Sequence, residues 1–309
     1  MRQQQTIARS MTCSGVGLHT GQPVTLTLRP AAPGTGIVFI QHATGGPVAV
    51  SASARNLTST ELCTGISAEG FSVKTVEHLL AALTGLGIDN VYAELTGGEV
   101  PAMDGSAGPF VRLLQAAGVV PQDRRQPYLK ITEPIEVTAG DRSIAIVPAS
   151  TPRITYTIQY DHPLIGRQTY DFQWTPFSFE REIADARTFG FLDEVEQLWS
   201  RGLGKGGSLD NTIVIGDRDV VNDSGLRYRD EFVRHKVLDL IGDLSLLGRP
   251  LIGHLVADRA GHALHAKLVE QILEQRDKWV LVSADDKSVV MPGAISSYAS
   301  VTLQASPIL

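Results

Sequence analysis

Hydrophobic and polar positions follow the same pattern in the two halves of the chain. Residues 24–40 are typical of a strand, a Pro-Ala turn and a second strand, and residues 143–158 repeat this pattern. Helical patterns at residues 76–85 and 233–242 then align without gaps, with Val, His, Leu and Gly at matching positions. The sequence therefore predicts an internal repeat.

The rest of each half continues the repeat. Apolar strand patterns at 90–95 and 251–256 lead to a Gly turn and an amphipathic helix, at 109–117 and 263–275. Extra sequence in the second half predicts an insert within about residues 160–230. We expect an α+β fold of two similar domains, each a β-sheet layered with two α-helices, with the helices sandwiched between the sheets and an insert in each domain.

A Pro- and charge-rich stretch at residues 121–127 separates the two halves and predicts a domain boundary. The N-terminal α+β domain is expected to cover residues 1–124. The C-terminal α+β domain, which carries the longer insert, is expected to cover residues 127–280. Residues 281–309 fit neither repeat, so we interpret them as a C-terminal extension of unknown role.

Length, charge and cysteine content narrow the class of protein. The chain has 309 residues, enough for two domains with a core each, and its net charge of −6 argues against nucleic acid as a partner. The N-terminus lacks the apolar core of a signal peptide, and no run of about eighteen apolar residues follows, so neither export nor membrane spanning is expected. Two cysteines without a CxxC pair suit a reducing compartment. We expect a cytoplasmic monomer that acts on a small molecule.

The repeat places a histidine, His78 or His235, at the same position of a helix in each half. In the second helix, a spacing of four residues puts His235, Asp239 and Asp243 on one face, and most other positions are apolar. A buried carboxylate is costly without a partner, and a cation removes that cost. Two imidazoles and one carboxylate would fill three of the four positions of a catalytic zinc ion, although such a site also accepts iron(II) or cobalt(II). The alternative is a surface His-Asp pair.

Glu77 lies directly before His78. A carboxylate beside a metal ligand can accept a proton from a water molecule, so Glu77 is a candidate general base. The alternative is an ordinary glutamate of a first helical turn, favoured there by the helix dipole. Thr75 is the candidate N-cap of this helix.

Two histidines, His262 and His265, begin the last helix of the repeat, and either could act as a cation oriented by Asp243. The alternative for each is a partly exposed helix residue. The glycine-rich stretch 202–208 fits no phosphate-loop motif, so we interpret it as a flexible loop; close approach of its backbone to a ligand, with Gly207 as a candidate contact, is a second interpretation. Residues 103–107 are typical of a turn before a helix.

Six segments together resemble one enzyme family, the UDP-3-O-acyl-N-acetylglucosamine deacetylases of lipid A biosynthesis. These segments are TVEHLLAALTGLGIDN, MDGSAGPF, DARTFGF, GLGKGGSLDNTIV, FVRHKVLDLIGDLSLLG and AGHALHAKLV. The resemblance extends over roughly residues 1–275 and includes SGVGLHTG at 14–21. It implies zinc-dependent removal of the N-acetyl group from UDP-3-O-(3-hydroxyacyl)-N-acetylglucosamine, which yields acetate and the free amine. This reaction is the committed step towards the lipopolysaccharide of the Gram-negative outer membrane.

The resemblance also implies roles for single residues. Its zinc ligands fall on His78, His235 and Asp239. The general base falls on Glu77. The general acid falls on His262, rather than His265, with Asp243 as its partner.

Further residues are implied as substrate contacts. Thr188 would supply a hydroxyl group near the oxyanion, and Lys236 lies beside the ligand helix; Phe189 and Gly207 complete the candidate contacts. An acyl passage would lie in the second insert, where several side chains are apolar enough to line it: Phe189, Phe191, Leu203, Ile213 and Val214.

Two other classes of protein remain open from the residues alone. One is a noncatalytic protein that binds a nucleotide sugar or an acyl chain and has a structural metal ion. Structural zinc sites usually have four protein ligands, whereas three are visible here. The other is a different metal-dependent hydrolase, such as a phosphoesterase, for which a carboxylate-rich two-metal site would be expected.

Overall fold

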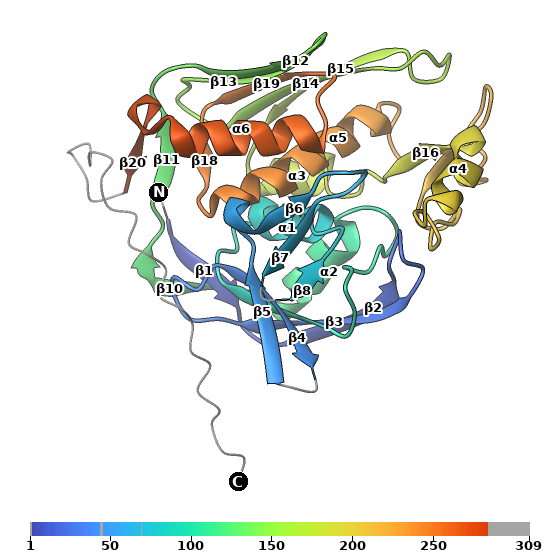
Figure 1. Cartoon of the computed structure of the whole chain (residues 1–309). Helices are drawn as coiled ribbons and strands as arrows, with labels where there is room; N and C mark the ends of the chain where they lie inside the picture. Colours follow the sequence, from blue (N-terminus) through green and yellow to red (C-terminus); the bar gives the residue numbers. More distant parts are fainter. Residues whose placement is uncertain (1, 44–45, 69, 284–309) are drawn as a thin grey trace.

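Two five-stranded sheets form the outer layers of the molecule, and the long helices lie between them (Figure 1). The computed structural model describes residues 2–43, 46–68 and 70–283, so most of the predicted extension 281–309 lies outside the described residues. The first sheet has the order β2-β3-β9-β4-β5, from β2 (Met11–Val16), β3 (Pro23–Pro30), β9 (Val91–Leu95), β4 (Ile37–Ala43) and β5 (Gly46–Ser51). The second has the order β12-β13-β19-β14-β15, from β12 (Ile135–Ala139), β13 (Arg142–Val147), β19 (His254–Asp258), β14 (Arg153–Gln159) and β15 (Arg167–Gln173).

The two sheets share one topology. In each, the strand that comes last in the sequence occupies the centre, antiparallel to one neighbour and parallel to the other. Each buries one face, as β3 does through Val24, Leu26 and Leu28, so the alternating pattern of the sequence faces the helices. The predicted α+β class with two similar halves is confirmed. The division into domains at residues 124–127 stays a prediction.

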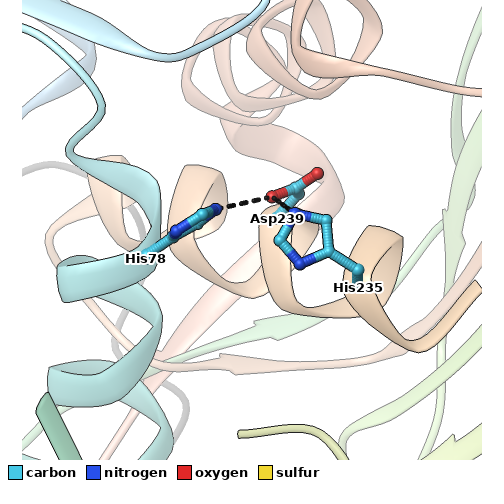
Figure 2. Close-up of side chains that lie close together, drawn as sticks. All are labelled: His78, His235 and Asp239. Carbon is cyan, nitrogen blue, oxygen red and sulfur yellow. Dashed lines mark ion pairs between the residues drawn. The ribbon is translucent and has the colours of Figure 1, made fainter. Parts of the chain in front are cut away.

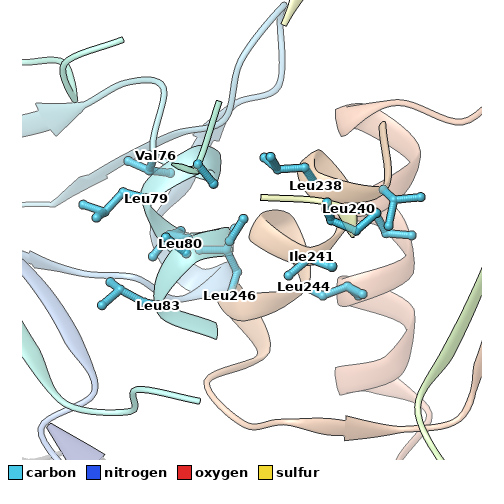
Figure 3. Close-up of a cluster of buried hydrophobic side chains, with 14 of the residues drawn as sticks. Val76, Leu79, Leu80, Leu83, Leu238, Leu240, Ile241, Leu244 and Leu246 are labelled. Carbon is cyan, nitrogen blue, oxygen red and sulfur yellow. The ribbon is translucent and has the colours of Figure 1, made fainter. Parts of the chain in front are cut away.

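The helices between the sheets are α1 (Glu77–Gly85), α2 (Gly108–Ala117), α3 (Pro176–Glu182), α5 (Glu231–Leu244) and α6 (His262–Glu274). Nearly all residues of α1 and α5 are buried, which places both helices in the centre of the core. They pack side by side, and Figure 3 shows the buried apolar side chains that surround this contact. At Gly242 of α5 a Cβ atom would lie 2.1 Å from the carbonyl oxygen of Glu77, so glycine permits this close approach.

Smaller elements complete the structure. Four short sheets are present in the described residues. Three of them contain β1 (Gln3–Ile7) with β10 (Val119–Arg125), β6 (Leu57–Ser59) with β7 (Gly65–Ala68) and β8 (Phe71–Val73), and β11 (Tyr128–Ile131) with β18 (Leu251–Ile252) and β20 (Trp279–Val282), and the fourth pairs β16 (Phe189–Phe191) with β17 (Ile213–Ile215) in the insert. The insert of the second half also contains α4 (Val195–Ser200). The 3-10 helices are η1 (Ala54–Asn56), η2 (Leu192–Glu194), η3 (Ser245–Leu247) and η4 (Arg276–Lys278). Within the described ranges, no helix is long and apolar enough to cross a membrane.

Three boundaries differ from the sequence prediction. The stretch 121–127 lies mostly in β10, which pairs with β1 as a two-stranded ribbon that tolerates Pro121 at an edge. The predicted insert 160–230 contains β15, which occupies the place of β5 in the repeated sheet, so the extra sequence begins after Gln173. The predicted strand 251–256 is divided at Gly253 into β18 and β19, which belong to different sheets.

Candidate metal centre

Side chains from α1 and α5 converge between the sheets. The Nε2 atom of His78 lies 3.6 Å from Oδ1 of Asp239, and Nε2 of His235 lies 3.3 Å from the same oxygen (Figure 2). All three residues are buried, and their potential ligand atoms lie within 4.8 Å of one another. The structure thus brings together the two histidines that the internal repeat pairs and the aspartate one turn after His235.

The tautomer of His235 supports a cation at this point. Its Nδ1 lies 3.0 Å from the carbonyl oxygen of Ala186, which can only accept a hydrogen bond. Burial lowers the pKa of His235 to about 3, so the ring is neutral and its single proton is on Nδ1. The lone pair of Nε2 therefore faces the carboxylate of Asp239. Two electron-rich groups in this arrangement fit a divalent metal ion between them.

Lys236 occupies the other side of the Asp239 carboxylate. Its Nζ donates a hydrogen bond of 2.8 Å to Oδ2, so Oδ1 remains directed towards the two histidines. Burial alone would raise the pKa of Asp239, but the cationic groups around it, Lys236 among them, lower that pKa well below its ordinary value. Asp239 is therefore an anion, as a metal ligand must be.

Glu77 is the first residue of α1, as the alternative of a first-turn glutamate also requires, but it is only 2% exposed. Its Oε2 accepts a hydrogen bond of 3.0 Å from the backbone N–H of Thr64. Burial raises the pKa of Glu77 to about 6, although His262 and His78 act in the opposite direction. A carboxylate that gains and loses a proton near neutral pH is suited to proton transfer.

The prediction that Thr75 caps this helix is wrong. The N-cap residue is Val76, and no side chain caps it. Thr75 has a φ of 56° and donates its hydroxyl hydrogen bond over 2.8 Å to the buried carboxylate of Glu99. Glu99 also accepts hydrogen bonds from the backbone N–H groups of His19 and Thr20. The buried carboxylate takes up the hydroxyl group that would otherwise bind the helix N-terminus.

A second cluster surrounds Asp243, one turn further along α5. Its Oδ2 lies 2.7 Å from Nδ1 of His262 and 2.8 Å from Nδ1 of His265. Burial would lower the pKa of His262, but Asp243 outweighs it and raises that pKa to about 9. In turn, His262 is the main group that lowers the pKa of Asp243 to about 2, against the effect of burial. The pair is therefore an imidazolium and a carboxylate near neutral pH.

The two histidines differ in their second ring nitrogen. The Nε2 of His262 lies 4.0 Å from Oδ2 of Asp239, so this ring borders the candidate metal centre. The Nε2 of His265 instead lies 3.0 Å from the hydroxyl group of Tyr156 and is fully buried. Both histidines contact Asp243, but only His262 reaches from Asp243 to the metal ligands.

Comparison with known proteins decides the family. The model of the family UDP-3-O-acyl N-acetylglycosamine deacetylase matches residues 4–274. The chain belongs to this family. Relatives named UDP-3-O-acyl-N-acetylglucosamine deacetylase include one from Syntrophotalea carbinolica, 48% identical over 285 residues (92% of each chain). One from Myxococcus xanthus is 48% identical over 281 residues (91% of this chain, 90% of the relative), and one from Chromohalobacter salexigens is 44% identical over 305 residues (98% and 100%).

Two further residues expected from the family, Thr188 and Phe189, follow the segment whose Ala186 carbonyl oxygen contacts His235. The backbone of Thr188 is hydrogen-bonded to Gly105 on one side and to Ile213 on the other, at 2.9 and 2.8 Å. The ring centroid of Phe189 lies 6.4 Å from that of His235, and Nζ of Lys236 lies 5.4 Å from the Phe189 ring.

Gly207 lies in the glycine-rich loop. Its N–H bonds the carbonyl oxygen of Gly204 at 3.1 Å, and the neighbouring Gly206 bonds Leu18 at 3.0 Å. A Cβ atom on Gly206 would lie 2.2 Å from the carbonyl oxygen of Gly17, so this loop packs against the residues 17–21. Contact between Gly207 and a substrate stays a prediction.

Several residues that hold the candidate site together were missed from the sequence. Arg187 and Glu231 form a buried ion pair in which the backbone N–H and Nε of Arg187 donate to Oε1 of Glu231 over 3.0 and 2.9 Å. The pair fixes the segment whose Ala186 carbonyl orients His235. Glu231 could have been noticed as a carboxylate at a helix start. Thr64 carried no such local signal.

Proposed function

We propose that this chain is a metal-dependent deacetylase of lipid A biosynthesis, located in the cytoplasm. Its substrate is UDP-3-O-(3-hydroxyacyl)-N-acetylglucosamine, and its products are acetate and UDP-3-O-(3-hydroxyacyl)-glucosamine. The observation that carries the proposal is the convergence of His78, His235 and Asp239 in a chain of the deacetylase family. The names of the relatives support the choice of substrate. These relatives align with at least 90% of this chain and are 44–48% identical to it over the aligned residues.

His78, His235 and Asp239 would hold one metal ion, for which zinc is our first choice and iron(II) the alternative. When bound, such an ion polarises a carbonyl group and lowers the pKa of coordinated water to about 7. The protein keeps the three ligand atoms on two helices packed against each other, so little reorganisation is needed before binding. Ala186 fixes the tautomer of His235, and Lys236 fixes the carboxylate of Asp239.

Glu77 acts as the general base. It accepts a proton from the water molecule that attacks the acetamide carbon. The backbone N–H of Thr64 holds Oε2, so Oε1 is the atom that receives the proton. Because burial raises its pKa to about 6, Glu77 is ionised at neutral pH yet basic enough to take up a proton during the reaction.

His262 acts as the general acid. Its imidazolium ring, held at Nδ1 by Asp243, donates from Nε2 to the nitrogen that leaves the carbonyl carbon. The same cation, together with the Thr188 hydroxyl group, stabilises the negative charge that develops on the carbonyl oxygen. Lys236, Phe189 and Gly207 complete the substrate contacts.

Release of acetate from the acylated UDP-sugar tests this function. We expect wild-type protein loaded with zinc to release acetate, and Glu77→Ala and His262→Ala to keep the metal but lose about 10²-fold to 10⁴-fold in rate. His78→Ala should lose the metal itself. Metal content per chain and acetate release are measured on the same preparations. Equal metal loss in all three variants would contradict the assigned roles, and substrate binding without acetate release in the wild type would indicate a noncatalytic binding protein.

A further inference from the structure

Thr64 contacts both halves of the proposed proton-transfer machinery. The residue directly precedes β7 and is 1% exposed. Its backbone N–H donates to Oε2 of Glu77 over 3.0 Å. Its hydroxyl group donates to Oδ1 of Asp243 over 2.5 Å and lies 3.3 Å from Nδ1 of His262. One buried residue thus touches the base, the acid and the partner of the acid.

The direction of these hydrogen bonds follows from the number of protons. The pKa of Asp243 is lowered to about 2, so its carboxylate is an acceptor and the single hydroxyl proton of Thr64 points towards it. The lone pairs of the hydroxyl oxygen are then available to the N–H of His262, at the longer distance. Two rings, of His262 and His265, already donate to Oδ2 of Asp243. Thr64 is therefore the group that holds the opposite oxygen and stops the carboxylate from rotating.

We propose that Thr64 is a positioning residue that sets the distance between the general acid and the general base, an inference that rests on the proposed deacetylase function. Base and acid act on the same carbonyl carbon, one on the incoming water and the other on the departing nitrogen. Their separation must therefore match one substrate amide, and errors of about 1 Å reduce rates strongly. Glu77 begins α1, Asp243 belongs to α5 and His262 begins α6, so a residue that bonds to all three elements can fix this separation.

The side chain and the backbone of Thr64 can be separated by substitution. Thr64→Val keeps the shape and the N–H bond to Glu77 but removes the hydroxyl group. Thr64→Ser restores it. Thr6 is a matched control, because it is also buried and its hydroxyl donates over 2.6 Å to the carbonyl oxygen of Asn90, outside the site.

We expect Thr64→Val to lower kcat about 10-fold to 100-fold, the range for a hydrogen bond to a charged group. The KM and the metal content should stay within about twofold, because the metal ligands and substrate contacts are unchanged. Thr64→Ser should recover most of the rate, and Thr6→Val should equal the wild type. An unchanged kcat in folded Thr64→Val, or a loss that serine does not restore, would overturn the proposal. If the valine variant does not fold, Thr64→Ala replaces it in the same comparison with serine.

A second measurement separates this proposal from the proposed function. Proton and nitrogen NMR of histidine-labelled, zinc-loaded protein reports the His262 Nδ1–H that bonds Asp243, and it needs no substrate. We expect this resonance to shift or broaden in Thr64→Val and to stay unchanged in Thr6→Val. Absence of acetate release with this shift present would refute the deacetylase function alone. An unshifted resonance in Thr64→Val would refute the role of Thr64 alone.

Discussion

Replacing Gly242 with alanine tests whether the close contact of two helices holds the candidate metal centre together. Gly242 lies in α5 between Asp239 and Asp243, and its α-carbon faces the first turn of α1. A Cβ atom at this position would lie 2.1 Å from the carbonyl oxygen of Glu77, whose neighbour His78 is a candidate ligand. The added methyl group would therefore push the backbone of α1, which carries His78, away from α5, which carries the other two candidate ligands.

The size of the effect follows from the distances. Ordinary contacts of a Cβ atom begin at 3.4 Å, so the helices must separate by 3.4 − 2.1 = 1.3 Å at this point or distort. Overpacking of this kind costs about 1–3 kcal/mol, and the better helix propensity of alanine returns up to about 1 kcal/mol. We expect a net loss of roughly 0–3 kcal/mol in the free energy of unfolding. Metal ligands tolerate displacements of only about 0.2 Å, so metal affinity should fall more clearly, by about 10-fold to 100-fold.

Gly85 provides a comparison, because it occupies the matching position of α1 in the repeat. Its Cβ atom would meet the ring of Phe179, at 2.3 Å, rather than a backbone that carries a ligand. We expect Gly85→Ala to reduce stability but to leave metal affinity near the wild-type value. Zinc affinity is measured by competition with a chelator, and stability by urea unfolding of the metal-free protein. Wild-type affinity in Gly242→Ala, or an equal loss in Gly85→Ala, would refute the reasoning.

Three other predictions concern buried charged or hydrogen-bonded groups. Activity should fall below about pH 6, where Glu77 becomes protonated, and above about pH 9, where His262 loses its proton; a kcat/KM that is constant from pH 5 to 10 would exclude these roles. Arg187→Met should lower the free energy of unfolding by roughly 3 kcal/mol, because Glu231 keeps its backbone donors but loses its buried cation. Urea unfolding measures this loss, and a clearly smaller loss would contradict the prediction. Tyr156→Phe should lower stability by about 1–3 kcal/mol with unchanged zinc content, since the hydroxyl group bonds only structural partners; loss of zinc would refute this.

The parts of the site that sequence could predict are those set by one helix. A spacing of four residues placed His235 and Asp239 on one face of α5, and the internal repeat placed His78 at the matching position of α1. Both inferences use the regular geometry of a helix, which holds before any tertiary contact is known. The repeat also predicted two similar sheets with helices between them, but not the order of the strands within each sheet.

The parts that sequence could not predict depend on partners far along the chain. Thr64 bonds Asp243 across 179 positions, and no local pattern marks a threonine that will be buried beside a carboxylate. Thr75 looked like an N-cap because threonine is favoured just before a helix, but the buried carboxylate of Glu99 binds its hydroxyl group instead. At Gly253, between β18 and β19, glycine permits a close approach of Ile146 from the neighbouring strand β13, because a Cβ atom there would lie 2.9 Å from that side chain.

The central claim is that one metal ion binds between α1 and α5, and anomalous diffraction tests it most directly. Data collected above and below the zinc absorption edge, on crystals of the zinc-loaded protein, locate the metal ion without reference to any assay. The account predicts one strong peak at about 2.0–2.2 Å from Nε2 of His78, Nε2 of His235 and Oδ1 of Asp239. A peak bound instead by Asp243, His262 and His265, or none between the two helices, would contradict it.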